Sequence, residues 1–126
     1  MRAIKIRAWN ISGEQWEYFT LEELACMGIY THVKGTSVSI CHWDNYRWWC
    51  QFTGLKDKNG KDAYDGHICQ VQNQDGKYDI GVIRYYEEMG QWFIEFLDGE
   101  TEPLWEFVFE IIGDVHTTPE LLEEKP

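Results

Sequence analysis

The sequence has few basic residues and no long apolar run. Its 126 residues include 11 Lys and Arg against 22 Asp and Glu, which gives a formal net charge of −11. Binding of duplex nucleic acid needs clustered Lys and Arg to replace the counterions of the phosphates, so this composition argues against it. No apolar run reaches the roughly 18 residues of a membrane-spanning helix, and Arg2, Lys5 and Arg7 interrupt any apolar leader. We therefore expect a cytoplasmic protein that does not contact membranes.

Motifs of catalysis and of metal binding are also lacking. The sequence contains no Gly-x-Ser-x-Gly elbow, phosphate-binding loop or His-Glu-x-x-His helix. Its His and Cys residues do not show the paired spacing of zinc ligands, and without a secretory context its four cysteines are expected to be reduced. We therefore expect a non-enzymatic protein with no cofactor and no metal. The residues that could have served as metal ligands are His32, Cys41, His42, Cys50, His67 and Cys69. The fourth cysteine is Cys26.

Aromatic residues, in contrast, are abundant, at 16% of the chain with 7 Trp. They gather in residues 42–49, HWDNYRWW, where flat apolar rings alternate with polar groups. Such a segment suits a partner protein's hot spot or a nucleobase. The alternative is that Trp48 belongs to a hairpin core while Trp49 faces the other way. An exposed Trp would then favour a homo-oligomer interface. The candidate binding residues are Tyr46, Arg47, Trp48 and Trp49.

Charge is distributed unevenly along the chain. Residues 1–60 carry seven basic and six acidic side chains, whereas residues 61–126 carry four basic and sixteen acidic ones. An acidic surface that includes Glu100, Glu102 and Glu106 can imitate nucleic-acid phosphates and occupy a basic groove of a host protein. The alternative, which such a composition favours, is that the acidic residues only keep a small domain in solution.

Hydrophobic periodicity predicts an α+β, mainly β fold. Residues 4–9 and 16–19 alternate as strands, and Thr20 with Glu23 predicts a capping box that opens a helix up to Met27. Strands at 36–41 and 48–52 are expected to pair as a hairpin. The segment 53–66 follows as a connecting loop with a type I′ turn at Asn59-Gly60. Together these features predict an N-terminal hairpin and helix unit over residues 1–52.

The rest of the chain predicts a small SH3-like barrel over residues 67–117. Five short strands punctuated by turn residues suit a closed barrel, which removes exposed strand edges. A short helical tail at 118–126 is expected to be capped by the Thr118 hydroxyl, with Pro119 in its first turn. The expected barrel strands are 67–73, 78–86, 91–97, 101–104 and 109–116.

Three segments resemble the YopX family of phage and prophage proteins. The start of the chain matches the family's Arg-Ala-Trp at residues 7–9, and its end resembles the family's closing run at residues 110–122. The most specific block is Gln-Phe-Thr-Gly-Leu-x-Asp-x-x-Gly-x-x-x-Tyr-x-Gly. We expect the residues that match the first segment and this block to have structural roles, and they are Arg7, Trp9, Gln51, Phe52, Gly54, Leu55, Asp57, Gly60, Tyr64 and Gly66.

The resemblance implies a phage-encoded protein in the cytoplasm of a bacterial host, and it carries no catalytic residues across. We expect a binding protein that blocks or sequesters a host component, such as a defence nuclease, as a counter-defence or anti-CRISPR-like inhibitor. One alternative is a sponge for a small cyclic nucleotide signal. Another is a structural or replication-associated phage protein without an inhibitory role.

Overall fold

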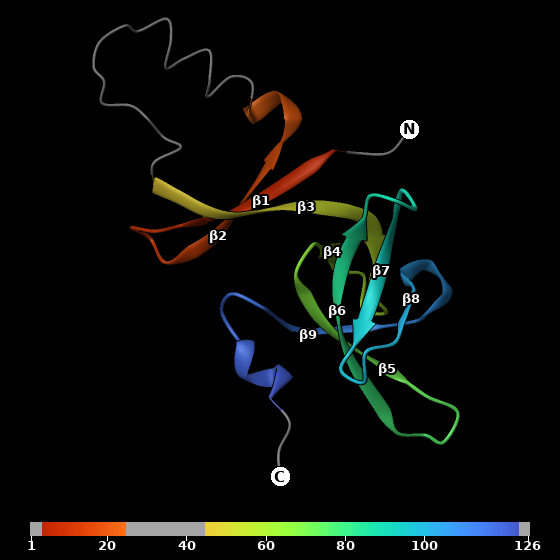
Figure 1. Cartoon of the computed structure of the whole chain (residues 1–126). Helices are drawn as coiled ribbons and strands as arrows, with labels where there is room; N and C mark the ends of the chain where they lie inside the picture. Colours follow the sequence, from red (N-terminus) through yellow and green to blue (C-terminus); the bar gives the residue numbers. More distant parts are fainter. Residues whose placement is uncertain (1–3, 25–44, 124–126) are drawn as a thin grey trace, which may run out of the picture. The chain divides into compact units, whose positions relative to one another are not determined.

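The computed structural model describes residues 4–24 and 45–123 (Figure 1). The chain divides into two compact units, Met1–Phe52 and Thr53–Pro126. Both are built from antiparallel strands with few helical residues, which confirms the predicted mainly β class. The predicted strand at 36–41 and the end of the first helix lie outside the described residues.

The first unit is centred on β1, which pairs antiparallel with a strand on each side. Residues 21–24 then form a helical turn. The Thr20 hydroxyl oxygen accepts the Glu23 N–H at 3.2 Å, and the Glu23 carboxylate accepts the Thr20 N–H at 3.0 Å. The predicted capping box is therefore confirmed. The strands are β1 (Lys5–Asn10), β2 (Gln15–Thr20) and the first part of β3 (Tyr46–Lys56).

The segment 53–66 is more regular than a connecting loop. β3 continues through its first residues to Lys56, and β4 (Asp62–Tyr64) lies inside it. The turn between them is not of type I′, because only Gly60 has a positive φ, of 83°. Instead the Gly60 N–H bonds the Asp57 carbonyl at 3.0 Å, and the Asp57 N–H bonds the Lys61 carbonyl at 2.8 Å. These bonds define a type I turn closed by a left-handed glycine.

A five-stranded antiparallel sheet forms the second unit, in the order β8-β7-β6-β5-β9. Its first four strands follow one another in the chain and pair as a meander. β9 then pairs with β5 at the opposite edge from β8. The strands are β5 (His67–Gln72), β6 (Tyr78–Tyr86), β7 (Gln91–Phe96), β8 (Thr101–Pro103) and β9 (Glu110–Asp114).

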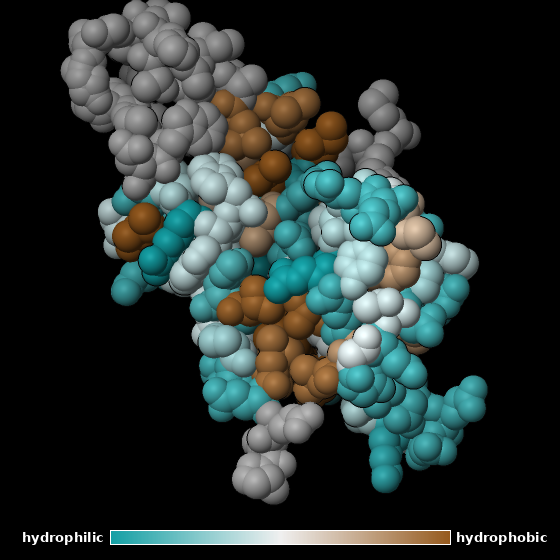
Figure 2. Space-filling model, viewed as in Figure 1, coloured by the Kyte–Doolittle hydropathy of each residue, from teal (hydrophilic) through white to brown (hydrophobic). Residues whose placement is uncertain are grey.

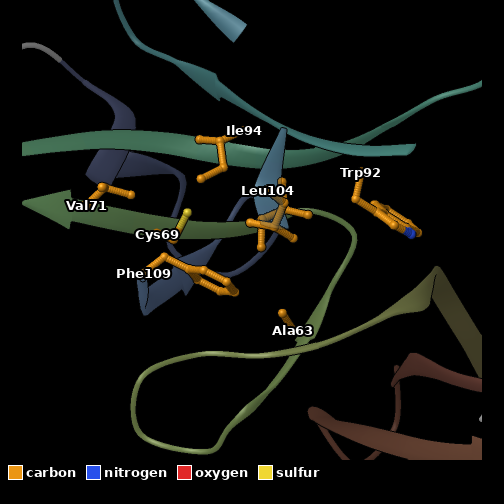
Figure 3. Close-up of a cluster of buried hydrophobic side chains, with 8 residues drawn as sticks. Ala63, Cys69, Val71, Trp92, Ile94, Leu104 and Phe109 are labelled. Carbon is orange, nitrogen blue, oxygen red and sulfur yellow. The ribbon is translucent and has the colours of Figure 1, made fainter. Parts of the chain in front are cut away.

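The core of this unit is packed on one face of the sheet (Figure 3). Figure 3 shows Cys69, Ile94, Leu104 and Phe109 pointing toward one another from β5, β7, η2 (Leu104–Glu106) and the segment before β9. Leu104 is fully buried and Phe109 is 3% exposed. The chain must cross from the β8 edge to the β5 edge between these two residues, so the crossing segment covers the core. The cluster is Ala63, Cys69, Val71, Ile83, Trp92, Ile94, Leu104 and Phe109.

The tail ends in a 3-10 helix, η3 (Pro119–Leu122), without the predicted side-chain cap. The Thr118 hydroxyl is used elsewhere. It accepts the Asp114 N–H at 2.9 Å and donates to the Asp114 carbonyl at 3.1 Å. Thr118 therefore fastens the tail to the end of β9, and the predicted cap is wrong.

Candidate functional site

A β-bulge in β3 determines how the predicted aromatic site is arranged. β1 pairs Arg7 with Cys50 and Trp9 with Arg47, so Trp48 and Trp49 together stand opposite the single residue Ala8. Trp48 takes a φ of 57°, a left-handed conformation that is uncommon for a bulky side chain. In a regular strand Arg47 and Trp48 would face opposite sides. The bulge instead brings both to one face and leaves Tyr46 and Trp49 on the other.

On the first face three tryptophans form a cluster. The ring of Trp9 lies 5.3 Å from that of Trp16 and 5.6 Å from that of Trp48. The Arg7 guanidinium lies 3.8 Å above the Trp16 ring, and the Arg47 guanidinium lies 4.1 Å above the Trp48 ring. The rings of this cluster are half-buried, and the two guanidinium groups stack on them, although Arg47 itself is exposed.

The second face carries Phe19, Tyr46 and Trp49. The Tyr46 ring lies 5.6 Å from the Phe19 ring and 5.7 Å from the Trp49 ring. Trp49 is 40% exposed although it is among the largest side chains of the unit. Phe19 and Tyr46 are half-buried beside it. An exposed ring supported by neighbouring rings is typical of a surface that binds a partner. We name Phe19, Tyr46 and Trp49 the aromatic face.

Polar groups fix the orientation of Tyr46. Its hydroxyl donates to Glu17 at 2.7 Å, and the Asn10 side-chain amide donates to the other oxygen of the same carboxylate at 2.5 Å. The Asn10 and Tyr46 hydrogen bonds hold the pKa of Glu17 below its ordinary value. Burial and the Glu17 carboxylate raise the pKa of Tyr46 to about 12. Tyr46 thus stays a neutral donor at physiological pH, with its ring held in place before any ligand arrives.

The structure therefore divides the predicted aromatic site. It brings Tyr46 and Trp49 together, and it places Arg47 and Trp48 with the tryptophan cluster of the opposite face. Sequence reasoning missed Phe19, Glu17 and Asn10. Cross-strand register is the signal that connects them, since Asn10 pairs with Tyr46 on β3 while Glu17 and Phe19 alternate along β2.

The predicted acidic residues lie at three different places in the second unit. Glu100 lies in the turn between β7 and β8, where its carbonyl accepts the Phe96 N–H at 2.8 Å. Glu102 lies on β8 opposite Ile94. Glu106 ends η2 and lines a groove of about 400 Å³.

The motif residue Asp57 has a structural role. It is 6% exposed, and its carboxylate accepts the N–H groups of Asn59 and Lys61 at 2.9 Å and of Ile111 at 3.0 Å. Burial acts to raise the pKa of Asp57, but the bonds from Ile111, Lys61 and Asn59 outweigh it and hold the pKa below its ordinary value. Asp57 therefore closes its own turn and fastens that turn to β9.

Other motif residues also shape the backbone. Gly54 and Gly66 have φ values of 89° and 86°, which only glycine adopts readily. Tyr64 is 2% exposed, and its N–H donates to the Nδ1 atom of the buried His67 at 2.9 Å. Leu55 packs against the core of the second unit. Phe52 is 8% exposed, whereas Gln51 is exposed opposite Ile6.

No group of three or more His, Cys, Asp or Glu residues that could hold a metal ion occurs within residues 4–24 and 45–123. Cys50 and Cys69 are buried free thiols, and burial raises the pKa of Cys69 to about 12. The other residues considered as possible metal ligands, His32, Cys41 and His42, lie outside the described ranges, as does Cys26. Over the same ranges, no helix is long and apolar enough to cross a membrane.

These observations define a mainly β protein with two antiparallel sheets, a motif whose residues shape the backbone, and a partly exposed aromatic face. The chain belongs to the YopX family, because the family model described as YopX protein matches residues 5–123. Its fold is also similar to the crystal structure of protein EF1440 from Enterococcus faecalis. That match has a TM-score of 0.57 and 23% identity and covers 98% of this chain and 100% of the other. No curated protein matches.

Proposed function

We propose that this chain is a phage-encoded binding protein of the host cytoplasm that blocks a host protein. The observation that carries the proposal is the aromatic face, where Trp49 is 40% exposed beside rings that are already oriented. Trp and Tyr dominate the energy of protein interfaces because they bury much area with few rotatable bonds. A face fixed by the Glu17 hydrogen bonds loses little side-chain entropy on binding.

The acidic second unit supports the same proposal. Residues 53–126 contain six basic and seventeen acidic side chains, so this unit attracts basic surfaces and repels nucleic acid. A host defence nuclease presents a basic groove to its substrate. The proposed role is therefore a counter-defence inhibitor, similar in action to an anti-CRISPR protein, that combines aromatic contacts with electrostatic steering.

Two finer features of the fold belong to the same proposal. The second unit is proposed to be SH3-like, because a four-stranded meander is followed by a crossing segment that runs from β8 to a fifth strand, β9, at the opposite edge of the sheet. The first unit is proposed to be a hairpin and helix module, and self-association through its aromatic face would give a homo-oligomer.

Capture of partners by the full chain tests the proposal. The tagged protein is incubated with lysate from phage-infected host cells, and captured proteins are quantified by mass spectrometry. Trp49→Ala removes the most exposed ring of the aromatic face, so affinity for a specific host protein should fall by about 30-fold or more. Trp105→Ala is the matched control, because Trp105 is 66% exposed in the second unit. Equal loss in both variants would contradict a binding role for the aromatic face.

Solution measurements separate the alternatives. Calorimetry with cyclic nucleotides should give no heat of binding if the partner is a protein, whereas tight binding abolished by Trp49→Ala would establish a nucleotide sponge.

Size exclusion with light scattering measures whether the chain forms a homo-oligomer. A monomer unchanged by Trp49→Ala would refute self-association through the aromatic face.

A further inference from the structure

A groove in the second unit opens where β9 stops pairing with β5. The last pair between these strands is Gln70 with Glu110, although β5 continues to Gln72 alongside β6. Continued by two residues, the same antiparallel register would place Val108 opposite Gln72. Both residues instead line the groove of about 400 Å³, which is within the range of ligand pockets, about 300–1,000 Å³.

β9 and β5 separate because the segment before β9 packs over the core of the sheet. Leu104 and Phe109 are buried in the core, and the Phe107 ring packs at 5.8 Å against that of Phe96 on β7. These contacts hold the crossing segment over the sheet, away from the edge of β5. Val108 points outward and is 76% exposed. The groove is therefore a consequence of the fold itself.

The edge of β5 offers backbone hydrogen-bonding groups to this groove. The Asn73 N–H donates to the Lys77 carbonyl at 2.7 Å in the turn between β5 and β6. This bond fixes which residues of β5 form hydrogen-bonded pairs with β6 and which direct their backbone groups to the other side. Asn73 and Val71 therefore direct their N–H and C=O groups toward β6, and Gln72 directs its own toward the groove. Within residues 4–24 and 45–123, no backbone partner bonds Gln72 on that side.

The outer edge of β9 is different, because it is already closed. The Ile111 N–H is bonded by the Asp57 carboxylate, the Asp114 N–H by the Thr118 hydroxyl, and the Phe109 carbonyl by the Lys58 N–H at 2.9 Å. Native sheets commonly block their edges in this way. The gap at Gln72 is therefore a local opening beside an edge that is otherwise protected.

Charge identifies the class of occupant. Glu106 and Glu110 flank the groove, and Lys58 lies 3.5 Å from Glu110. A hydrogen bond from Gln70 holds the pKa of Glu110 below its ordinary value, so this carboxylate is charged at neutral pH. Within the described residues no side chain pairs with Glu106. Tyr78, which is 53% exposed at the same groove, offers a ring face for a cation.

We propose that this groove binds an extended peptide segment bearing Arg or Lys, which adds as a short strand between Gln72 and Val108. Main-chain hydrogen bonds to Gln72 would supply affinity, and alternate basic side chains would reach Glu106 and Tyr78. This site goes beyond the aromatic face: it lies wholly in the second unit and does not depend on Trp49. Its occupant is a linear segment, whereas the aromatic face fits a folded surface.

Fluorescence anisotropy with labelled octapeptides tests the proposal on the full chain. The probes are VRVRVRVR, the acidic VEVEVEVE, and VRVRVRVR N-methylated at alternate residues on its backbone. The unmodified Arg peptide should bind in the micromolar range, and both other peptides should lose most of that binding. Spermidine serves as a cation without peptide groups and should compete poorly.

Paired variants locate the site. Glu106→Gln should weaken binding of VRVRVRVR by about three-fold, as expected for loss of one exposed ion pair. Glu88→Gln makes the same change at the exposed turn between β6 and β7 and should leave binding unchanged. In ¹⁵N spectra the Arg peptide should shift the amides of Gln72 and Val108 most.

Several outcomes would overturn the proposal. Equal binding of the N-methylated peptide would exclude strand addition, and equal competition by spermidine would reduce the site to general charge attraction. Equal loss in Glu106→Gln and Glu88→Gln, or shifts confined to other strands, would place the peptide elsewhere. Trp49→Ala should leave peptide binding intact, so failure of the aromatic face and failure of this groove are distinguishable.

Discussion

The two units of the chain organise their apolar side chains in opposite ways. Of the buried hydrophobic residues described, Ala8, Cys50 and Phe52 belong to the first unit and the other twelve to the second. Eight of the twelve in the second unit pack into one core cluster of aliphatic and aromatic side chains. The first places most of its rings on the two faces of a sheet, in contact with one another and half-buried or partly exposed. On the face of the molecule drawn in Figure 2, hydrophilic residues cover much of the surface and hydrophobic residues gather in a few patches.

This difference predicts which substitutions affect stability and which affect binding. A buried core stabilises through area removed from water and through close packing. Ring contacts on an open sheet stabilise less, but they leave aromatic surface available to a partner. We therefore expect substitutions in the second unit to change stability most, and substitutions in the first unit to change binding.

The largest expected effect comes from opening the core of the second unit. Leu104 is fully buried, so Leu104→Ala should lower the free energy of unfolding by about 3 kcal/mol, through lost burial and a residual cavity. Leu97 is 42% exposed, and Leu97→Ala should cost less than about 0.5 kcal/mol. Urea unfolding of the full chain measures both. Similar costs for the two variants would contradict the assignment of the core.

Asp57 tests whether the motif acts through structure. Asp57→Asn should lower the free energy of unfolding by about 2 kcal/mol at pH 7. The carboxylate accepts N–H groups on both of its oxygens, whereas the amide NH₂ of Asn would face one of these donors without accepting from it. The pKa of Asp57 is lowered in the folded protein, so its contribution is present above the ordinary value of 3.8. It is lost as pH falls through the lower folded value.

The pH profile of unfolding provides the check for Asp57. The difference between the native chain and Asp57→Asn should shrink as the medium is acidified below pH 3.8, the ordinary pKa of the carboxyl. Asp98→Asn is the control, since Asp98 accepts one turn N–H and is exposed. A difference that stays constant with pH would show that the charge of Asp57 has no role.

Arg47 tests the bulge in the first unit. The bulge brings its guanidinium to 4.1 Å above the Trp48 ring, so Arg47→Gln should cost about 0.5–1 kcal/mol. Hydrogen exchange should show the loss in the amides of β1 and β2 and leave the second unit unchanged. Increased exchange in β5 to β7 would instead show that the two units unfold together.

The smallest expected effect is at an exposed ion pair. Lys56 lies 2.6 Å from Asp62, with their side chains 61% and 25% exposed. Water and salt screen such a pair, so Lys56→Gln should change the free energy of unfolding by no more than about 0.5 kcal/mol. A loss above 1 kcal/mol in urea unfolding would give this pair a structural role that its exposure does not explain.

Much of the fold was predictable because it depends on local chemistry. Alternation marked β1 and β2, turn residues separated the strands of the five-stranded sheet, and the Thr20 and Glu23 pair marked a capping box. Predictions failed where contacts made in the folded chain override the local pattern. The Thr118 hydroxyl was predicted to cap the tail, yet it bonds Asp114. The segment 53–66 was predicted as a loop, yet it contains the end of β3 and all of β4.

The candidate site was only half predictable, for a related reason. Composition pointed to Tyr46 and Trp49, but strict alternation cannot reveal a bulge that moves Trp48 beside Arg47. The partners Glu17 and Phe19 lie far away in the sequence and meet Tyr46 only through strand pairing.

By itself, the sequence determined the mainly β class, the positions of most turns, the uneven charge and the family, because each depends on residue type and short spacing. Only the tertiary structure decided which rings share a face, that Asp57 fastens a turn to β9, and that β9 stops pairing with β5 after Gln70. These features depend on strand register and on the path of a crossing segment. Register is set by long-range packing, which no local pattern specifies.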